Sequence, residues 1–429
     1  MVKHRDRATG MAQMPADGCA ASPAPASSSL LADGAAGATP VMAQYLEIKT
    51  ANPDSLLWYR MGDFYELFFE DAVVASEALS IVLTKRGQHQ GKAIPMCGVP
   101  VHRADEYLQR LIKKGFRVAV CEQLEDPAEA RKRGAKAVVK RDVVRLVTPG
   151  TITEDALLEA KARNYLTALF ARPEDLARRA GLETAIAIAS VDISTGEFEL
   201  GELMLADLAG ELVRLSPSEI ICGDALLADG TVKRAVQLSG GVATPVPEAY
   251  FDSQAGSRDL KAQLGVRELD GFGSFSRSAL AATGAVLRYI ALTQMGQRPH
   301  LRPPRRMGHG AGLIIDAGSR ASLELVTALS GGASTTLFAA MDRTVSGAGG
   351  RELMARVTSP LADGAEINAR LDAVAHVLAN RRLMEELREI VRGVPDAARA
   401  LPRLTFGRGG PRDLAAIGVG DARAGAVDG

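Results

Sequence analysis

Two clusters of basic side chains in this sequence could contact phosphate groups. Seven basic residues fall between Arg131 and Arg145 against Asp142 alone, a local charge of +6 in a chain whose 51 basic and 51 acidic side chains cancel. A run of this kind suits contacts to a phosphate backbone. By itself it is equally typical of a solvated face or a mobile loop. A second basic loop extends from Lys85 to Lys92.

The aromatic residues gather just before that second loop. Aromatic side chains are only 4% of the sequence, yet six of them fall within twelve consecutive positions: Trp58, Tyr59, Phe64, Tyr65, Phe68 and Phe69. Gly62-Asp63 predicts a turn between a strand and a helix. That turn would place Phe64 and Glu66 at a helix start, with at least one side chain projecting outward. The alternative is that all six rings belong to the core.

Two other patterns match catalytic or cofactor sites only in part. Gly87 to Ala93 looks like a phosphate-cradling loop, but its two glycines are one residue too close and Ala93 stands where a Ser or Thr would bind magnesium. Asp192 could lie on the first catalytic strand of a ribonuclease-H-like nuclease. Two-metal hydrolysis needs several converging carboxylates, and because no convincing partner for Asp192 is evident we expect a structural role. We therefore predict no catalytic, cofactor-binding or metal-binding residues in this chain.

Length and composition predict a soluble protein of several domains. The 429 residues, 47% of them hydrophobic, suggest about two to four domains. No apolar stretch approaches the roughly 20 residues of a membrane span, and no secretory signal is evident. The four cysteines form no CxxC pair, which disfavours a disulfide framework or a zinc ribbon and favours the cytoplasm.

The order of predicted elements divides the chain into five parts. They are a disordered leader (1–39), a small mixed α/β domain (40–147), a second α/β unit (148–275), a mostly helical unit (276–416) and an irregular tail (417–429). A helix should begin at Thr39-Pro40, where a capping hydroxyl precedes a proline, and should carry Met42, Tyr45 and Leu46.

Hydrophobic periodicity places the remaining elements. Strands are expected at 56–59, 81–84, 116–120, 138–147, 165–170, 184–194, 197–200 and 220–222. Helices are expected at 70–79, 104–114, 206–215, from 276 onward and at 371–391. The predicted fold is therefore multidomain, α/β followed by α.

Several segments together resemble the bacterial MutS family of DNA mismatch-repair proteins. The matching segments, in the family's order, are 60–68 (RMGDFYELF), 83–87 (LTKRG), 94–100 (IPMCGVP), 115–123 (GFRVAVCEQ), 145–151 (RLVTPGT), 192–196 (DISTG), 331–332 (GG) and 342–344 (DRT). The resemblance covers roughly residues 40 to 415. It implies a mismatch-recognition domain, a ribonuclease-H-like connector domain and part of an all-α core domain.

The resemblance also implies roles for individual residues. Phe64 and Glu66 match the Phe-x-Glu motif, in which the ring wedges into the minor groove against the mispaired base and the carboxylate hydrogen-bonds that base. Lys85, Arg86 and His102 are candidates for holding the DNA backbone without reading its sequence. The implied partners are mismatched double-stranded DNA and a MutL-type repair protein docked on the connector.

The sequence departs from the family pattern towards its end. MutS proteins continue into lever helices, a DNA clamp and a C-terminal ATPase domain that uses ATP and Mg²⁺ and contributes the main dimer contact. Residues 418–429 are instead rich in Gly and Ala, so we expect a truncated or frame-shifted product. ATPase activity, stable dimerisation and ring closure around DNA are therefore not expected of this chain.

Two alternative functions remain open from sequence. One is a metal-dependent nuclease built around Asp192. The other is a protein-docking module without DNA affinity, because the connector of such families serves as a docking surface.

Overall fold

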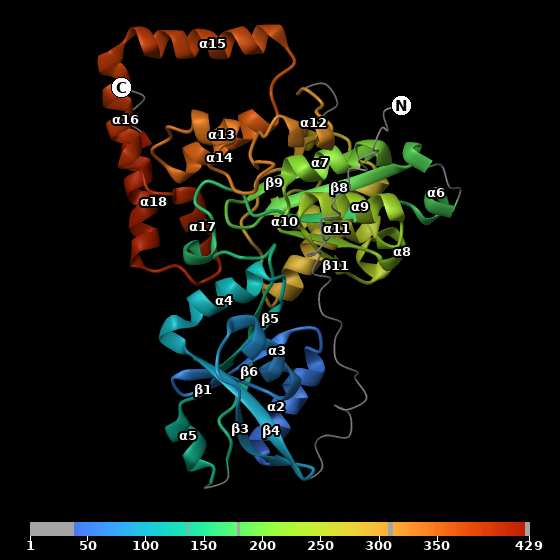
Figure 1. The fold of residues 1–429 in the computed structure, drawn as a ribbon, viewed down its shortest axis with the longest axis vertical. Helices are drawn as coiled ribbons and strands as arrows, with labels where there is room; N and C mark the ends of the chain where they lie inside the picture. Colours follow the sequence, from blue (N-terminus) through green and yellow to red (C-terminus); the bar gives the residue numbers. More distant parts are fainter. Residues whose placement is uncertain (1–37, 135–136, 178–180, 308–311, 425–429) are drawn as a thin grey trace, which may run out of the picture.

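The computed structural model describes residues 38–134, 137–177, 181–307 and 312–424. Two six-stranded sheets, each flanked by helices, are followed by a set of helices that starts near residue 317 (Figure 1). The predicted α/β-then-α fold class is confirmed. The expected disordered leader lies almost wholly outside the described residues.

The first sheet has the strand order β3-β4-β2-β1-β5-β6. Its strands are β1 (Leu56–Met61), β2 (Phe64–Phe68), β3 (Thr84–His89), β4 (Lys92–Pro100), β5 (Val118–Gln123) and β6 (Arg141–Val147). Strands β1 and β5 run parallel, whereas every other neighbouring pair is antiparallel. Strand β2 is therefore held by backbone hydrogen bonds on both sides.

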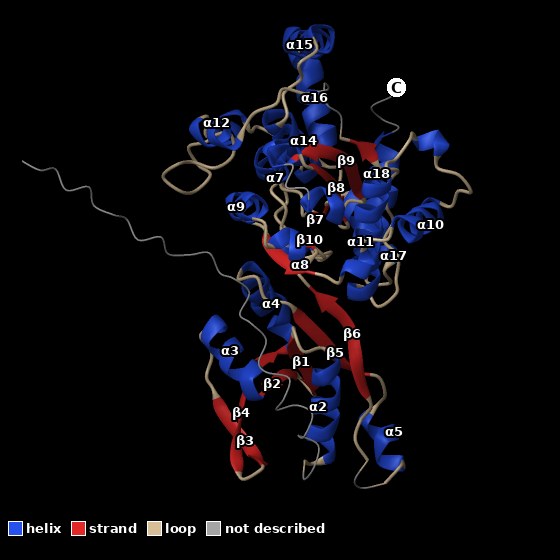
Figure 2. Cartoon of the chain, turned by 90° about the vertical axis from the view of Figure 1, so that its right-hand side faces the viewer, coloured by secondary structure: helices blue, strands red, loops and turns tan. Residues whose placement is uncertain are grey.

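Helices cover both faces of this sheet, with α2 on one side and α3 on the other (Figure 2). The helices of this unit are α2 (Pro40–Ala51), α3 (Phe69–Leu79), α4 (Ala104–Lys113) and the short α5 (Pro127–Lys132). Helix α2 begins as predicted, because the Thr39 hydroxyl accepts a hydrogen bond from the Met42 amide and Pro40 follows at the first helical position. Met42, Tyr45 and Leu46 are buried, as expected.

Two local predictions in this unit are wrong. Gly62-Asp63 joins β1 to β2 as a hairpin and does not lead into a helix, because residues 64–68 pair with β1 and β4. Gly62 has φ 61°, which suits a tight turn. The strand expected at 81–84 begins only at Thr84, since residues 81–83 lie outside the sheet and Val82 is 78% exposed.

The second sheet has the order β11-β10-β7-β8-β9-β12. Its strands are β7 (Leu166–Phe170), β8 (Ala185–Asp192), β9 (Glu197–Met204), β10 (Glu219–Cys222), β11 (Val242–Pro245) and β12 (Arg305–Arg306). The helices are α6 (Pro173–Ala177), α7 (Leu208–Leu215), α8 (Asp224–Leu227), α9 (Gly230–Ser239), α10 (Ser253–Leu264) and α11 (Arg277–Thr293). Buried side chains of α7 and α9 cover one face, and those of α10 and α11 cover the other.

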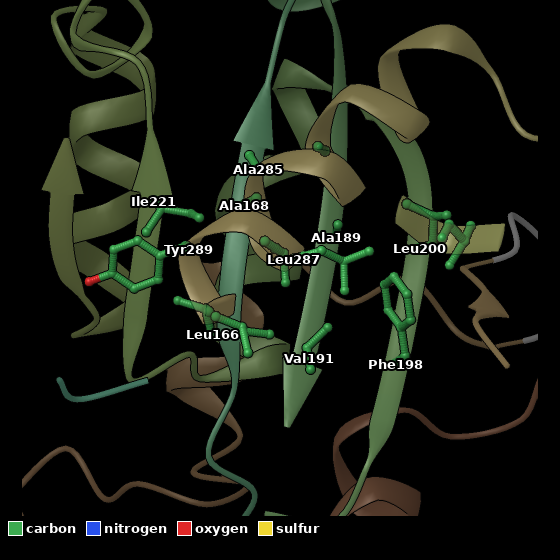
Figure 3. Close-up of a cluster of buried hydrophobic side chains, with 14 of the residues drawn as sticks. Leu166, Ala168, Ala189, Val191, Phe198, Leu200, Ile221, Ala285, Leu287 and Tyr289 are labelled. Atoms are coloured by element: carbon green, nitrogen blue, oxygen red, sulfur yellow. The ribbon is translucent and has the colours of Figure 1, made fainter. Parts of the chain in front are cut away.

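Helix α11 was expected to open the third, helical unit, but it packs on the second sheet. Ala285, Leu287 and Tyr289 of this helix belong to the same buried cluster as Leu166 and Val191 of the sheet (Figure 3). The helix is buried on most of its circumference, which is typical of a helix inside a core. The expected boundary at residue 276 therefore does not separate α11 from the sheet.

The remaining helices are α12 (Ala317–Ser322), α13 (Leu337–Met341), α14 (Gly347–Thr358), α15 (Gly364–Ala379), α16 (Arg381–Arg392), α17 (Ala397–Thr405) and α18 (Pro411–Ala424). Helix α18 corrects the irregular tail expected from 417, since Gly418 and Gly420 lie within it. In the part of the chain that the structure describes, no helix is both long and apolar enough to cross a bilayer.

Buried arginines tie this helical unit to the segment that leads into β7. Arg399 of α17 donates from Nη2 to the carbonyl oxygens of Glu159 (2.9 Å) and Ala162 (2.7 Å). Arg351 of α14 donates from Nη1 to the Ala160 carbonyl (2.9 Å) and forms an ion pair of 2.8 Å with Asp396. A guanidinium can satisfy several carbonyl and carboxylate oxygens at once, so these side chains hold the two parts in a defined arrangement.

Candidate nucleic-acid interface

Phe64 is an aromatic side chain held at the surface by a rigid strand. It is the first residue of β2, directly after the hairpin turn, and its Cα pairs with Met61 on one side and Pro100 on the other. Its side chain is 47% exposed, whereas Trp58, Tyr59 and Phe68 are buried. The alternative that all six rings of this segment are core is therefore wrong for Phe64.

Glu66 lies two residues further along β2 and so points to the same face of the sheet as Phe64. Its Cα pairs with Tyr59 and with Gly98, and its side chain is only 13% exposed. Tyr59 and Phe68 lie on the same face, where Tyr45 of α2 packs edge-on against both rings. The Phe-x-Glu motif therefore places an aromatic ring and a carboxylate on the same face of a strand that is paired on both sides.

The Glu66 carboxylate is occupied by Arg86 of β3. Nη1 of Arg86 donates hydrogen bonds to both carboxylate oxygens, and the two side chains form an ion pair. The Arg86 side chain is 48% exposed, so the pair is open to solvent from the arginine side. Sequence analysis placed Arg86 among the backbone-binding candidates and did not anticipate this contact.

Gly98 of β4 lies beside Phe64 and Glu66, and sequence analysis did not single it out. The strand order β3-β4-β2 puts β4 between Arg86 and Glu66. A Cβ atom on Gly98 would lie 3.3 Å from the Tyr65 carbonyl oxygen, 3.6 Å from Cγ of Glu66 and 3.8 Å from Cδ1 of Phe64. The available signal was a glycine inside an apolar strand, which often marks a close approach of other groups.

The other two candidate residues are exposed but make no direct contact with this pair. Lys85 lies on β3 next to Arg86, and His102 lies in the short 3₁₀ helix Val101–Arg103 that follows β4. The Val101 amide donates to the Asp63 carbonyl at 2.9 Å, which ties this 3₁₀ helix to the hairpin before Phe64. His102 therefore lies in a segment tied to the hairpin before Phe64, whereas Lys85 pairs with Pro95 of β4.

The basic run between Arg131 and Arg145 does not form one surface. Arg141 is buried and donates to the carbonyl oxygens of Arg60 (2.7 Å) and Val139 (3.0 Å). Arg145 forms an ion pair with Glu154, and burial, together with a nearby arginine, lowers the pKa of Arg145 to about 10. Other members of the run, such as Arg131, stay exposed, so only part of the predicted +6 charge is available to a phosphate backbone.

Asp192 serves the turn between β8 and β9. Its Oδ1 accepts from the amide (2.9 Å) and hydroxyl (2.6 Å) of Ser194, and its Oδ2 accepts from the Asn164 amide (3.1 Å). The side chain is fully buried. These contacts agree with the structural role predicted for Asp192. Among the described residues, no group of three or more His, Cys, Asp or Glu side chains is arranged to hold a metal ion.

Three family descriptions match consecutive parts of the chain. Residues 39–156 match MutS domain I, residues 164–302 match MutS domain II and residues 318–424 match MutS domain III. The DNA mismatch repair protein MutS of Rhizobium meliloti (strain 1021) is 52% identical over 391 residues, which are 91% of this chain and 42% of that protein. The chain therefore spans less than half the length of this relative.

Proposed function

Because the chain belongs to the MutS family of DNA mismatch-repair proteins, we propose that its first sheet binds mismatched double-stranded DNA, with Phe64 as the wedge. The observation that supports this proposal most directly is the half-exposed Phe64 ring on a strand that is paired on both sides. A ring on such a strand can be pushed between bases without the strand yielding.

An inserted ring discriminates through the cost of deforming DNA. Wedging an apolar side chain between base steps unstacks them and kinks the duplex, at a cost of about a few kcal/mol per step. A mispaired base is already less well stacked and paired, so the cost is lower there. Phe64 therefore binds best where the duplex is weakest, without reading a particular sequence.

Glu66 adds a second element of discrimination. A carboxylate next to a polyanion is unfavourable unless it accepts a hydrogen bond from a base. A mispaired base pushed aside by Phe64 offers such a donor, whereas a matched pair keeps its donors within the helix. Glu66 therefore penalises matched DNA more than mismatched DNA. Lys85 and His102, which are both exposed, contact the phosphate backbone.

We also propose that the second sheet unit docks a MutL-type repair partner.

Competition binding of a G·T duplex and its matched counterpart tests the wedge. We expect Phe64→Ala to abolish the mismatch preference, and Glu66→Ala to narrow it by raising affinity for matched DNA. Met204→Ala is a suitable control, because Met204 is also 47% exposed but ends β9 in the second sheet. An unchanged preference in the Phe64 variant would refute the proposal.

A further inference from the structure

We infer that Arg86 is a positioning and specificity-determining residue that acts through Glu66, and is not simply a phosphate contact. This inference rests on the proposed function of Phe64 and Glu66. Its basis is the ion pair in which one nitrogen, Nη1 of Arg86, spans both oxygens of the Glu66 carboxylate. A carboxylate with both oxygens engaged by one donor group has a fixed orientation and a compensated charge.

The sheet is built to allow this contact. Arg86 and Glu66 lie on strands that are not neighbours, so the arginine side chain reaches Glu66 across β4. Glu66 pairs with Gly98 of β4, whereas Lys85, next to Arg86 on β3, pairs with Pro95. Any side chain at Gly98 would stand beside Cγ of Glu66 and the Phe64 ring. Gly98 therefore leaves the space next to the Phe64 ring and the Glu66 carboxylate free of a side chain.

Burial makes the pairing matter for DNA binding. The Glu66 side chain is 13% exposed and has little water to screen its charge, whereas Arg86 is 48% exposed and reaches solvent. Without Arg86, an approaching duplex would meet an uncompensated carboxylate next to the Phe64 ring. With Arg86 in place, the duplex meets a carboxylate whose orientation is fixed and whose charge is partly offset by the guanidinium.

Arg86 also has N–H groups that Glu66 does not use. Within the described residues, only Nη1 of Arg86 has a hydrogen-bond partner, although a guanidinium carries five N–H groups. Arg86 can therefore contact a phosphate or a displaced base while it still holds Glu66. The contribution of Arg86 to DNA affinity should therefore depend on the presence of Glu66. The contribution of an independent phosphate contact would not depend on it.

A double-mutant cycle in the 429-residue chain tests this coupling. Affinities for G·T and matched duplexes are measured for the parent, Arg86→Gln, Glu66→Ala and the double variant. We expect Arg86→Gln to weaken G·T binding about tenfold or more when Glu66 is present, and by no more than about threefold in the Glu66→Ala background. Arg86→Lys, which keeps the charge, should restore part of the loss.

Lys85→Gln is the matched control, because it removes the same charge from the neighbouring position without touching Glu66. It should weaken both duplexes equally and show no coupling to Glu66. The inference fails if Arg86→Gln behaves like Lys85→Gln. In that case it would lower the salt dependence of the DNA affinity by about one phosphate contact, and its effect would be additive with that of Glu66→Ala. Arg86 would then be a phosphate contact only. Phe64→Ala separates the failure of the two proposals. If this variant keeps the preference for the G·T duplex, the wedge proposal is refuted. If it loses the preference while the effects of Arg86→Gln and Glu66→Ala are additive, only the role of Arg86 is refuted.

A measurement without DNA examines the pair itself. Water-soluble carbodiimide modifies accessible carboxylates, and peptide mass spectrometry reports the labelling rate of Glu66. We expect Glu66 to be labelled several-fold faster in Arg86→Gln than in the parent or in Lys85→Gln. Equal rates in all three proteins would show that Arg86 does not hold the carboxylate in solution and would overturn the inference.

Discussion

Glu219→Gln is expected to destabilise the junction between the two sheets. Glu219 on β10 is fully buried and accepts four hydrogen bonds. Oε2 accepts from the Thr148 hydroxyl and from the Gly150 amide (3.0 Å), and Oε1 accepts from the hydroxyls of Thr244 (2.8 Å) and Tyr289 (2.6 Å). Thr148 and Gly150 belong to the segment that leaves the first sheet after β6. The carboxylate therefore anchors that segment to the second sheet.

The size of the effect follows from the donors that lose their acceptor. Glutamine replaces one carboxylate oxygen with an NH₂ group, so two of the four donors face another donor. Hydrogen bonds to a charged group contribute about 1.5–3 kcal/mol each. The Thr148 hydroxyl can rotate to accept from the new NH₂ group, whereas the Gly150 amide cannot. Burial, reinforced by Glu219, raises the pKa of the Tyr289 phenol well above the ordinary value, so Tyr289 stays protonated and keeps donating to the oxygen that remains. We therefore expect a loss of about 2–4 kcal/mol.

Urea unfolding followed by two signals measures this loss. The only tryptophan, Trp58, lies in the first sheet, so its fluorescence reports that unit, whereas far-ultraviolet circular dichroism reports the whole chain. We expect the dichroism midpoint to fall by on the order of 1 M urea. Glu268→Gln is the control, because the Glu268 side chain is 73% exposed and pairs only with Lys261. If Glu219→Gln unfolds at the same urea concentration as this control, the reasoning is refuted.

Two further predictions concern buried polar groups. Asp192→Asn should lower the free energy of unfolding by about 1–3 kcal/mol in thermal unfolding, because the asparagine amide cannot accept from every donor that contacts the Asp192 carboxylate. If the parent chain cleaves a labelled duplex in the presence of a metal ion and this variant does not, the nuclease alternative is favoured instead. Burial raises the pKa of Cys97, Cys121 and Cys222 to about 12, so each stays a protonated thiol below that pH in the folded chain. Iodoacetamide at pH 8 should modify these three only after denaturation, and rapid labelling of the native protein, read by mass spectrometry, would contradict this.

The sequence by itself determined the features that depend on neighbouring residues. The start of α2 was predictable because the Thr39 hydroxyl and Pro40 act within one turn of the helix. The family was identifiable because its motifs occur in order along the chain, and Phe64 and Glu66 could be named from one of them. The structural role of Asp192 also follows from a local motif, since Ser194 is two residues away.

Tertiary structure decided which of these residues share a surface. Gly62-Asp63 is compatible with either a helix or a hairpin, and only the pairing of β2 with β1 and β4 selects the hairpin. Phe64 is exposed on this strand, whereas Tyr59, Tyr65 and Phe68 are buried. No local rule distinguishes these outcomes, because the hydrogen bonds that select them come from other strands.

The clearest case is Arg86, which the sequence placed with the phosphate contacts. Its ion pair with Glu66 joins residues twenty positions apart through the strand order β3-β4-β2. The dispersal of the basic run around Arg145 has the same origin, since Glu154 reaches Arg145 only in the folded chain. Charge and residue type are local properties, whereas the partner that compensates a charge is set by the packing of the whole sheet.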